Sequence, residues 1–189
     1  MLNALRFSHQ CLQQLLDTFP QGHFIDATLG NGHDIYSIVT HDGFLGKAYG
    51  FDIQQIALEN TRQRLSQVET NRYTLYKMGH EHIRYVLQDI PTFSGAIFNL
   101  GYLPGGDHQI TTLFINTQAA IEAISEKLEI GAQIILVLYS GHPQGKIEKN
   151  QLLKYLESWP QKKFQILHYQ FINQENNPPS CIIIERLKD

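Results

Sequence analysis

The alternation of short apolar runs with longer amphipathic runs is the feature that most constrains the fold of this chain. Runs rich in β-branched and aromatic residues have the length of strands and occupy residues 23–27, 48–52, 74–77, 95–99, 133–139, 164–171 and 181–186. Runs with helical spacing separate the earlier strands and occupy residues 33–40, 54–68, 80–88, 112–128 and 147–158. Strands joined through helices form right-handed βαβ crossovers, so the sheet is expected to be mainly parallel.

The end of the chain departs from this pattern. The segment INQENNPPS, residues 172–180, joins the last two predicted strands and has no room for a helix. Two strands joined by a short, turn-rich loop run antiparallel. We therefore expect an α/β fold with a doubly wound, seven-stranded, mostly parallel sheet and an antiparallel C-terminal strand.

Length and composition indicate one domain, residues 1–189, with an N-terminal helix within residues 1–20. The N-terminus has no apolar core of a signal peptide, and the longest aliphatic run, 134–138, is far short of a membrane span of about 20 residues. We expect no membrane partner and a cytoplasmic location. Cys11 and Cys181 lie far apart in the sequence, which argues against a disulfide framework, and no residue set has metal-ligand spacing.

The segment DATLGNGHD, residues 26–34, follows the first predicted strand, where ligands bind in doubly wound sheets. Gly30 and Gly32 allow a tight turn and a close approach to a ligand. No lysine follows Gly32, which argues against a phosphate-binding P-loop, and Ile35 stands where a dinucleotide fingerprint needs glycine. Asp26, just before the turn, would repel a pyrophosphate but would attract the ammonium and sulfonium of S-adenosylmethionine.

A second carboxylate, Asp52, closes the second predicted strand about 20 residues beyond the loop. Such a carboxylate accepts hydrogen bonds from the ribose hydroxyls of an adenosine, whether the cofactor is NAD or S-adenosylmethionine. Gln54 can reach the ribose or the adenine. A purely structural role stays open for both carboxylates, because Asp26 could brace a turn or cap a helix and Asp52 could be a helix N-cap.

Four segments together resemble class I S-adenosylmethionine-dependent methyltransferases, with a Rossmann-like sheet. They are DATLGNGHD, GFD at 50–52, GHE at 79–81 and NLGYLPGGDH at 99–108, and they are most similar to a bacterial family described as rRNA methylases. Members of that family are associated with methylating 5-aminomethyl-2-thiouridine at the tRNA wobble position. The resemblance implies S-adenosylmethionine as cofactor, the tRNA anticodon stem-loop as partner, and methylation of an exocyclic amine. One departure is Thr28, where a glycine is common in methyltransferase loops.

The resemblance also implies site residues. The expected cofactor-binding residues are Asp26, Gly30, Asn31, Gly32, Asp34, Asp52, Gln54, His80 and Glu81. His80 and Glu81 would lie against the adenine, although Glu81 could simply complement a helix dipole. His9 would lie near the active cleft, although a surface position is at least as compatible with its helix.

The expected catalytic residues are Asn99, Tyr102, Asp107 and His108. NLGY at 99–102 matches the ends of the NPPY pattern of amino-methyltransferases but lacks its prolines. In that pattern the asparagine carbonyl accepts from the target amine and the aromatic ring packs on the substrate. An aminomethyl group is mostly protonated at neutral pH, so a base is needed, and Asp107, His108 and Asp26 are candidates. Alternatively, Asn99 closes a strand and Tyr102 packs against it.

Other features leave several alternatives open. Asn177 to Pro179 form a literal NPP in the final hairpin, read as a turn that the resemblance places near the substrate mouth. With a net charge of −3, RNA contacts must rest on local patches. The available basic residues, which could equally form an ordinary solvated surface, are Lys146, Lys149, Arg62, Arg64, Lys162 and Lys163. The aromatic C-terminal hairpin could form a homodimer face.

Three alternative functions stay open from the sequence. They are a methyltransferase for rRNA or a small molecule, a non-catalytic cofactor-binding module, and a nicotinamide oxidoreductase.

Overall fold

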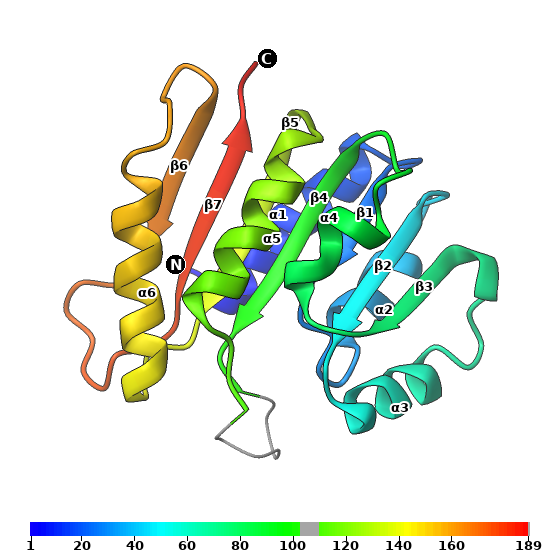
Figure 1. Ribbon diagram of the computed structural model, residues 1–189, viewed down its shortest axis with the longest axis horizontal. Coiled ribbons are helices and arrows are strands. Elements are labelled where there is room, and N and C mark those ends of the chain that lie inside the picture. The colour runs from blue at the N-terminus through cyan, green and yellow to red at the C-terminus, as the bar shows by residue number, and fades with distance from the viewer. Residues whose placement is uncertain (103–109, 189) are drawn as a thin grey trace.

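The centre of the computed structural model, which describes residues 1–102 and 110–188, is a seven-stranded sheet with helices on both faces (Figure 1). The strands are β1 (His23–Asp26), β2 (Lys47–Asp52), β3 (Tyr73–Lys77), β4 (Phe93–Leu100), β5 (Leu128–Leu138), β6 (Phe164–Tyr169) and β7 (Ser180–Arg186). Their order in the sheet is β3-β2-β1-β4-β5-β7-β6. β1 to β5 pair in parallel, whereas β7 is antiparallel to both β5 and β6. The expected doubly wound sheet with one reversed strand is confirmed.

The helices divide between the two faces of the sheet. They are α1 (Ala4–Thr18), α2 (His33–Val39), α3 (Gln55–Arg64), α4 (Ile83–Val86), α5 (Phe114–Glu126) and α6 (Pro143–Leu156), with short 3-10 turns η1 (Thr70–Arg72) and η2 (His80–His82). One core cluster joins α1, α2 and α3 to the sheet through residues such as Leu12 and Leu58, and another joins α4, α5 and α6 through residues such as Ile121. In Figure 1, α5 lies in front of the sheet and α1 behind it. No helix among the described residues is long and apolar enough to cross a membrane.

The predicted N-terminal helix exists and begins where the sequence supplies a cap. The side chain of Asn3 accepts a hydrogen bond from the Arg6 amide at 2.9 Å, a standard N-cap contact. Leu12 and Leu16, one helical turn apart, are each 1% exposed and pack on the sheet. Leu5 has the same helical spacing but lies in the first turn of the helix and is 38% exposed.

Some element boundaries differ from the sequence-based expectation. α6 begins at Pro143 rather than at residue 147, because the His142 ring accepts from the Gly145 amide at 3.2 Å and proline suits the first helical turn. β5 begins at Leu128, five residues before the predicted position 133, because Leu128 pairs with Phe93 ahead of a register shift. The helix expected over 80–88 is divided into η2 and α4.

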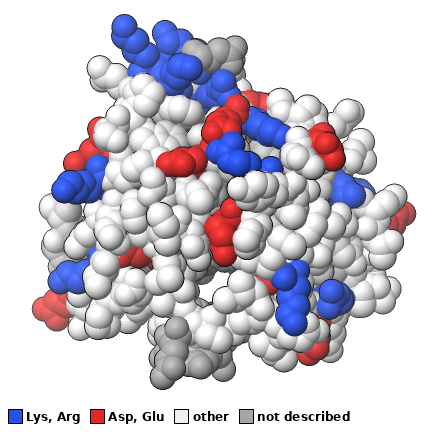
Figure 2. Space-filling model, in the orientation of Figure 1, with Lys and Arg blue, Asp and Glu red and all other residues white. Residues whose placement is uncertain are grey.

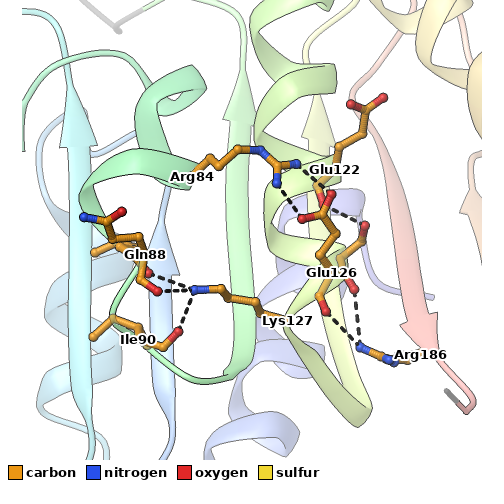
Figure 3. A network of polar contacts seen from close by, with 9 residues as sticks. Arg84, Gln88, Ile90, Glu122, Glu126, Lys127 and Arg186 are labelled. Carbon is orange, nitrogen blue, oxygen red and sulfur yellow. Dashed lines mark hydrogen bonds and ion pairs between the residues drawn. The ribbon is translucent and has the colours of Figure 1, made fainter.

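A cluster of ion pairs and charge-assisted hydrogen bonds closes the end of the sheet opposite the carboxyl ends of the parallel strands (Figure 3). Arg84 on α4 contacts both carboxylate oxygens of Glu126 on α5, at 2.5 and 2.7 Å. The Lys127 ammonium donates to backbone carbonyls after α4, including that of Gln88 at 2.6 Å. Arg186 on β7 donates to the Leu128 carbonyl at 2.8 Å. We call these four residues, Arg84, Glu126, Lys127 and Arg186, the distal network.

Candidate functional site

A cavity of about 980 Å³ opens at the carboxyl ends of the parallel strands, at the upper end of the range for small-molecule sites. Its described walls come from α1, the loops after β1, β2, β3, β4 and β5, and the loop between β6 and β7. Figure 2 shows the molecular face hollowed at its lower edge, where these strands end in Figure 1. The predicted residues that line it are Gly30, Asn31, Asp34, Asp52, Gln54, His80, Glu81, Asn99 and Tyr102. Asp107 and His108 lie outside the described residues.

The glycines of the first loop have different roles. Gly30 has φ +51° and Gly32 has φ +74°, both left-handed conformations that favour glycine. A Cβ atom at Gly32 would lie 2.7 Å from the Thr61 hydroxyl oxygen on α3. Gly32 therefore lets the loop pack against α3 and does not line the cavity, whereas Gly30 does.

Asp26 is fully buried beneath the loop and is not among the described lining residues. Its carboxylate accepts hydrogen bonds from the amides of Thr28, at 3.2 Å, and Ile35, at 3.0 Å, so it braces the loop and the start of α2. Burial raises the pKa of Asp26, and the nearby charge of Asp34 raises it further. The geometry fits the bracing role, so Asp26 can influence a ligand through its field and the shape of the loop.

Asp52 faces the cavity at the end of β2. One oxygen accepts from the Gly30 amide at 3.0 Å and the other from the Gln54 amide at 2.9 Å. Burial raises the pKa of this carboxyl, while the backbone amides oppose that change. Each oxygen keeps a second lone pair, so the carboxylate can accept two more hydrogen bonds from a ligand while it orders the loop.

Asn99, at the end of β4, belongs to a chain of hydrogen bonds that spans three elements. Its side-chain amide donates to Asp34 on α2 at 2.6 Å, and Asp34 accepts from the His9 ring on α1 at 3.0 Å. The Asn99 backbone amide donates to the Thr28 hydroxyl at 2.7 Å. Because the amide nitrogen is committed to Asp34, the Asn99 carbonyl oxygen is left as an acceptor. We call His9, Asp34 and Asn99 the Asn99 chain.

Aromatic and proline side chains form the other described wall. Tyr102 pairs as a β-bridge with Thr111, and its ring lies 5.2 Å from the His142 ring, centroid to centroid. Tyr139, at the end of β5, and Pro178 and Pro179, before β7, also line the cavity. The NPP turn therefore lies at the cavity wall. Flat rings and proline faces on this side suit a planar substrate group.

His80 forms part of the cavity floor. Its Nδ1 donates to the Ala27 carbonyl at 3.0 Å and its Nε2 lies 3.5 Å from the Thr117 hydroxyl. Burial lowers the pKa of this imidazole, so it is neutral at physiological pH. Thr117 in turn donates to the buried Glu148 at 2.7 Å. Both His80 ring nitrogens face protein atoms, so His80 shapes the wall beneath a ligand.

Some lining residues have weak signals in the sequence. Ile53 is 57% exposed and immediately follows Asp52, a position where an apolar side chain can cover a flat ligand. Thr28 lines the cavity and positions Asn99, but a lone threonine in a loop carries no distinctive signal. Leu5 has helical spacing with core residues, and yet it lies at the cavity.

Solved structures resemble the whole chain. A protein from Clostridium thermocellum described as a "putative rRNA-methylase" is 36% identical, has a TM-score of 0.88, and the match covers 99% of both chains. A protein from Streptococcus mutans described as a "putative methyltransferase" was solved in complex with SAH. It is 36% identical to this chain, has a TM-score of 0.86, and the match covers 99% of both chains.

A relative of this chain is named for a tRNA substrate. The chloroplastic tRNA (mnm5s2U34)-methyltransferase of Arabidopsis thaliana is 33% identical over 171 residues, which are 86% of this chain and 62% of the plant protein. This chain thus spans less than two thirds of that relative's length. The family model described as "Putative rRNA methylase" matches residues 48–185, a segment that contains Asp52, Asn99 and all but the outermost residues of β2 to β7. This chain belongs to that rRNA methylase family.

Proposed function

We propose that this protein is an S-adenosylmethionine-dependent N-methyltransferase that acts on RNA. The observation that carries the proposal is the placement of Asp52, the Gly30 loop and Asn99 around one cavity, with the Asn99 carbonyl left as an acceptor. Membership of the rRNA methylase family and the two structural relatives, one of them solved with SAH, support the cofactor and the reaction class.

The residues present fit S-adenosylmethionine. When bound, the cofactor supplies an electrophilic methyl group on a positively charged sulfur. Asp52 would accept from the ribose hydroxyls, and the loop at Gly30 and Asn31 would follow the methionine part. The carboxylates of Asp34 and Asp52 face the cavity, and no Lys or Arg is found among the described residues that line it. This electrostatic balance favours a cationic ligand.

The Asn99 chain provides a way to aim an amine. The carbonyl oxygen of Asn99 accepts a hydrogen bond from the target nitrogen, which directs the nitrogen lone pair away from that oxygen. Asp34 fixes the amide orientation, and His9 in turn holds Asp34. Fixing the reacting geometry in advance removes a large part of the entropic cost of the transfer. Tyr102 and Tyr139 lie where they can flank the nucleobase that carries the amine.

The amine must lose a proton before it can react, because an ammonium has no lone pair. Asp107 and His108 stay our candidates to accept it, and they lie outside the described residues. Desolvation by the adjacent apolar wall favours the neutral amine over its ammonium, whereas the side-chain carbonyl of Asn99 can accept from either form, so a base is still required.

For the substrate, we propose 5-aminomethyl-2-thiouridine at the tRNA wobble position, presented by the anticodon stem-loop in the cytoplasm. The plant relative bears the name of the corresponding tRNA methyltransferase, which supports this choice. A ribosomal RNA target is the second candidate, because the family description names rRNA and a stretch of 90 residues is 33% identical to ribosomal RNA small subunit methyltransferase H of Streptococcus mutans.

The test uses tritiated S-adenosylmethionine and tRNA from cells that lack this protein, with nucleosides resolved by mass spectrometry. We expect label and the mass of one added CH₂ on 5-aminomethyl-2-thiouridine. Ribosomal RNA from the same cells is the parallel substrate, and label there alone would move the assignment to rRNA. Absence of transfer to any RNA by protein that binds the cofactor would overturn the RNA assignment.

A further inference from the structure

A second, smaller cavity adjoins the first. Its volume is about 570 Å³, and it lies between the glycine loop, α2 and α3. Its walls are Asn31, His33, Tyr36, Asn60, Gln63 and Arg64. Asn31 and His33 line both cavities, so the two form neighbouring compartments along the same edge of the molecule.

Hydrogen bonds between elements hold the walls of this second cavity in place. Asn60 on α3 donates to the side-chain oxygen of Asn31 at 2.9 Å. The Arg64 side chain donates from Nε to the Asn31 carbonyl at 2.8 Å and from Nη2 to His33 Nε2 at 3.2 Å. These contacts fix the plane of the guanidinium, and the remaining N–H groups of Arg64 can donate to a ligand in the cavity.

The charges of the two cavities are complementary to different parts of a nucleic acid. The large cavity has carboxylates at Asp34 and Asp52 and no Lys or Arg among its described lining residues. A phosphate of an RNA strand would be repelled there, so the phosphates that flank a target nucleotide must be held outside it. Arg64 is a cation at the adjoining compartment, and its planar guanidinium suits a phosphate.

Tyr36 supplies an aromatic face in the same compartment. It is 41% exposed, while Asp34, Ile35, Ile38 and Val39 of the same short helix are buried. The ring therefore contributes little to the core. Exposed aromatic rings beside a cationic group are the usual platform on which a single-stranded base stacks.

We propose that the second cavity binds the nucleotide next to the target in the RNA substrate, with its phosphate on Arg64 and its base on Tyr36. This inference rests on the proposed function, because it requires an RNA substrate. In this proposal, Arg64 and Tyr36 bind the RNA strand while the target nucleotide enters the large cavity.

The first test compares Arg64→Gln with Arg62→Gln. Both variants remove one positive charge from the last turn of α3, but Arg62 lines neither cavity. Binding of a synthetic anticodon stem-loop is measured by fluorescence anisotropy over a range of salt concentrations. We expect Arg64→Gln to weaken binding about tenfold and to reduce the magnitude of the salt slope by about 1, with a clearly smaller change for Arg62→Gln.

The second test addresses Tyr36, whose ring has no hydrogen bond to the glycine loop among the described contacts. Tyr36→Ala should weaken stem-loop binding about tenfold, because one base–aromatic stack is lost, and Tyr36→Phe should bind like the wild type. Calorimetric titration with S-adenosylmethionine accompanies every variant. An unchanged cofactor affinity shows that the glycine loop keeps its shape.

The outcomes separate the two proposals. If the wild type neither binds nor methylates RNA, the proposed function fails. If the wild type methylates RNA but Arg64→Gln behaves like Arg62→Gln and Tyr36→Ala like Tyr36→Phe, the proposed function stands and the second cavity is not a nucleotide site. If Arg64→Gln lowers cofactor affinity and RNA affinity together while Tyr36→Ala has no effect, Arg64 only braces the loop and the inference is overturned.

Discussion

The Asn99 chain and the distal network are both polar contacts that tie helices to the sheet, but they lie in opposite environments. The Asp34 side chain at the centre of the Asn99 chain is 9% exposed and that of His9 is 43% exposed, whereas the side chains of Glu126 and Arg84 are 57% and 46% exposed. The Asn99 chain joins residues 25 and 65 positions apart at the cavity. The exposed network joins α4, α5 and β7 at the far end of the sheet (Figure 3).

The difference shows what each group of polar residues contributes. Burying a carboxylate has a large desolvation cost, so buried acids gather where a ligand or a reaction needs them. Burial raises the pKa values of Asp52, which lines the cavity, and of Asp26, which lies beneath its glycine loop. In the distal network, Arg84 lowers the pKa of Glu126, and the pair is solvated and screened. The shifted carboxyl groups at the cavity end are typical of a functional site, whereas the solvated pair at the distal end contributes modestly to stability.

The largest effect should follow the loss of Asp52. Asp52→Ala should weaken S-adenosylmethionine binding by about a hundredfold, because it removes charge-assisted hydrogen bonds to the ribose and an acceptor for the Gly30 amide. Isothermal titration calorimetry measures the affinity, and circular dichroism checks that the fold persists. The matched control is Asp42→Ala at an exposed position outside the cavity. Equal affinities of Asp52→Ala and wild type would remove Asp52 from the cofactor site.

A comparable loss, confined to the methyl-transfer step, is expected for Asn99. Asn99→Ala should lower kcat by about a hundredfold because the target amine is no longer aimed, while cofactor affinity stays at the wild-type value. Single-turnover methyl transfer and calorimetry separate the two quantities. Asn71→Ala, on an exposed 3-10 turn, serves as control. A parallel loss of cofactor affinity would instead place Asn99 in cofactor binding.

A smaller effect is expected for His9, which acts through Asp34. His9→Gln should lower kcat about tenfold at unchanged cofactor affinity. The hydrogen bond and charge of Asp34 raise the pKa of His9 above its ordinary value of 6.5, against an opposing effect of burial. The folded state therefore gains stability from His9 below pH 6.5, and this gain is lost as pH rises through the raised pKa.

Urea unfolding of the wild type and His9→Gln over a series of pH values measures that gain. The difference between the two should be largest on the acidic side and should shrink with increasing pH. A pH-independent difference would mean that His9 contributes packing alone and does not act as a charge partner of Asp34.

The smallest effect is expected in the distal network. Glu126→Gln should destabilise the protein by less than about 1 kcal/mol, because the pair with Arg84 is solvated. Arg84 lowers the pKa of Glu126 below its ordinary value of 4.5, so the contribution is present above that pH and is lost as pH falls through the lowered pKa. Thermal unfolding at low and high salt measures it, and methyl transfer should be unaffected. A loss of several kcal/mol, or of activity, would contradict the contrast between the two regions.

The fold could be predicted from the sequence because its elements are local patterns. The alternation of strands and helices predicted the sheet, and the short segment before β7 predicted the reversed strand. The predicted starts of β5 and α6 were less accurate, and each of these elements contains a glycine that is not part of a turn. Gly145 lies in the first turn of α6, and Gly131, with φ +80°, lies within the range of β5.

The site was predictable where one residue marks a strand end. Asp52 and Asn99 line the cavity as expected, because their strands end there. Asp26, also at a strand end, turned inward, since its side chain meets the amides of Thr28 and Ile35. The link from His9 to Asn99 could not be read from spacing, because it depends on the packing of α1 against α2 and β4. For the same reason, sequence alone could not separate Arg64 from Arg62.

The reversed strand β7 has a consequence for how such a protein can change over time. Since β6 ends and β7 begins at the carboxyl edge, the loop between them, with Pro178 and Pro179, reaches the cavity wall. A chain connection at this position can lengthen, shorten or change composition while the neighbouring strands keep their pairing. The residues that we propose bind the adenosine lie on the other side of the sheet order, at β1 and β2. If the proposed function holds, substrate choice can change in one hairpin while the half of the sheet proposed to bind the methyl donor stays the same.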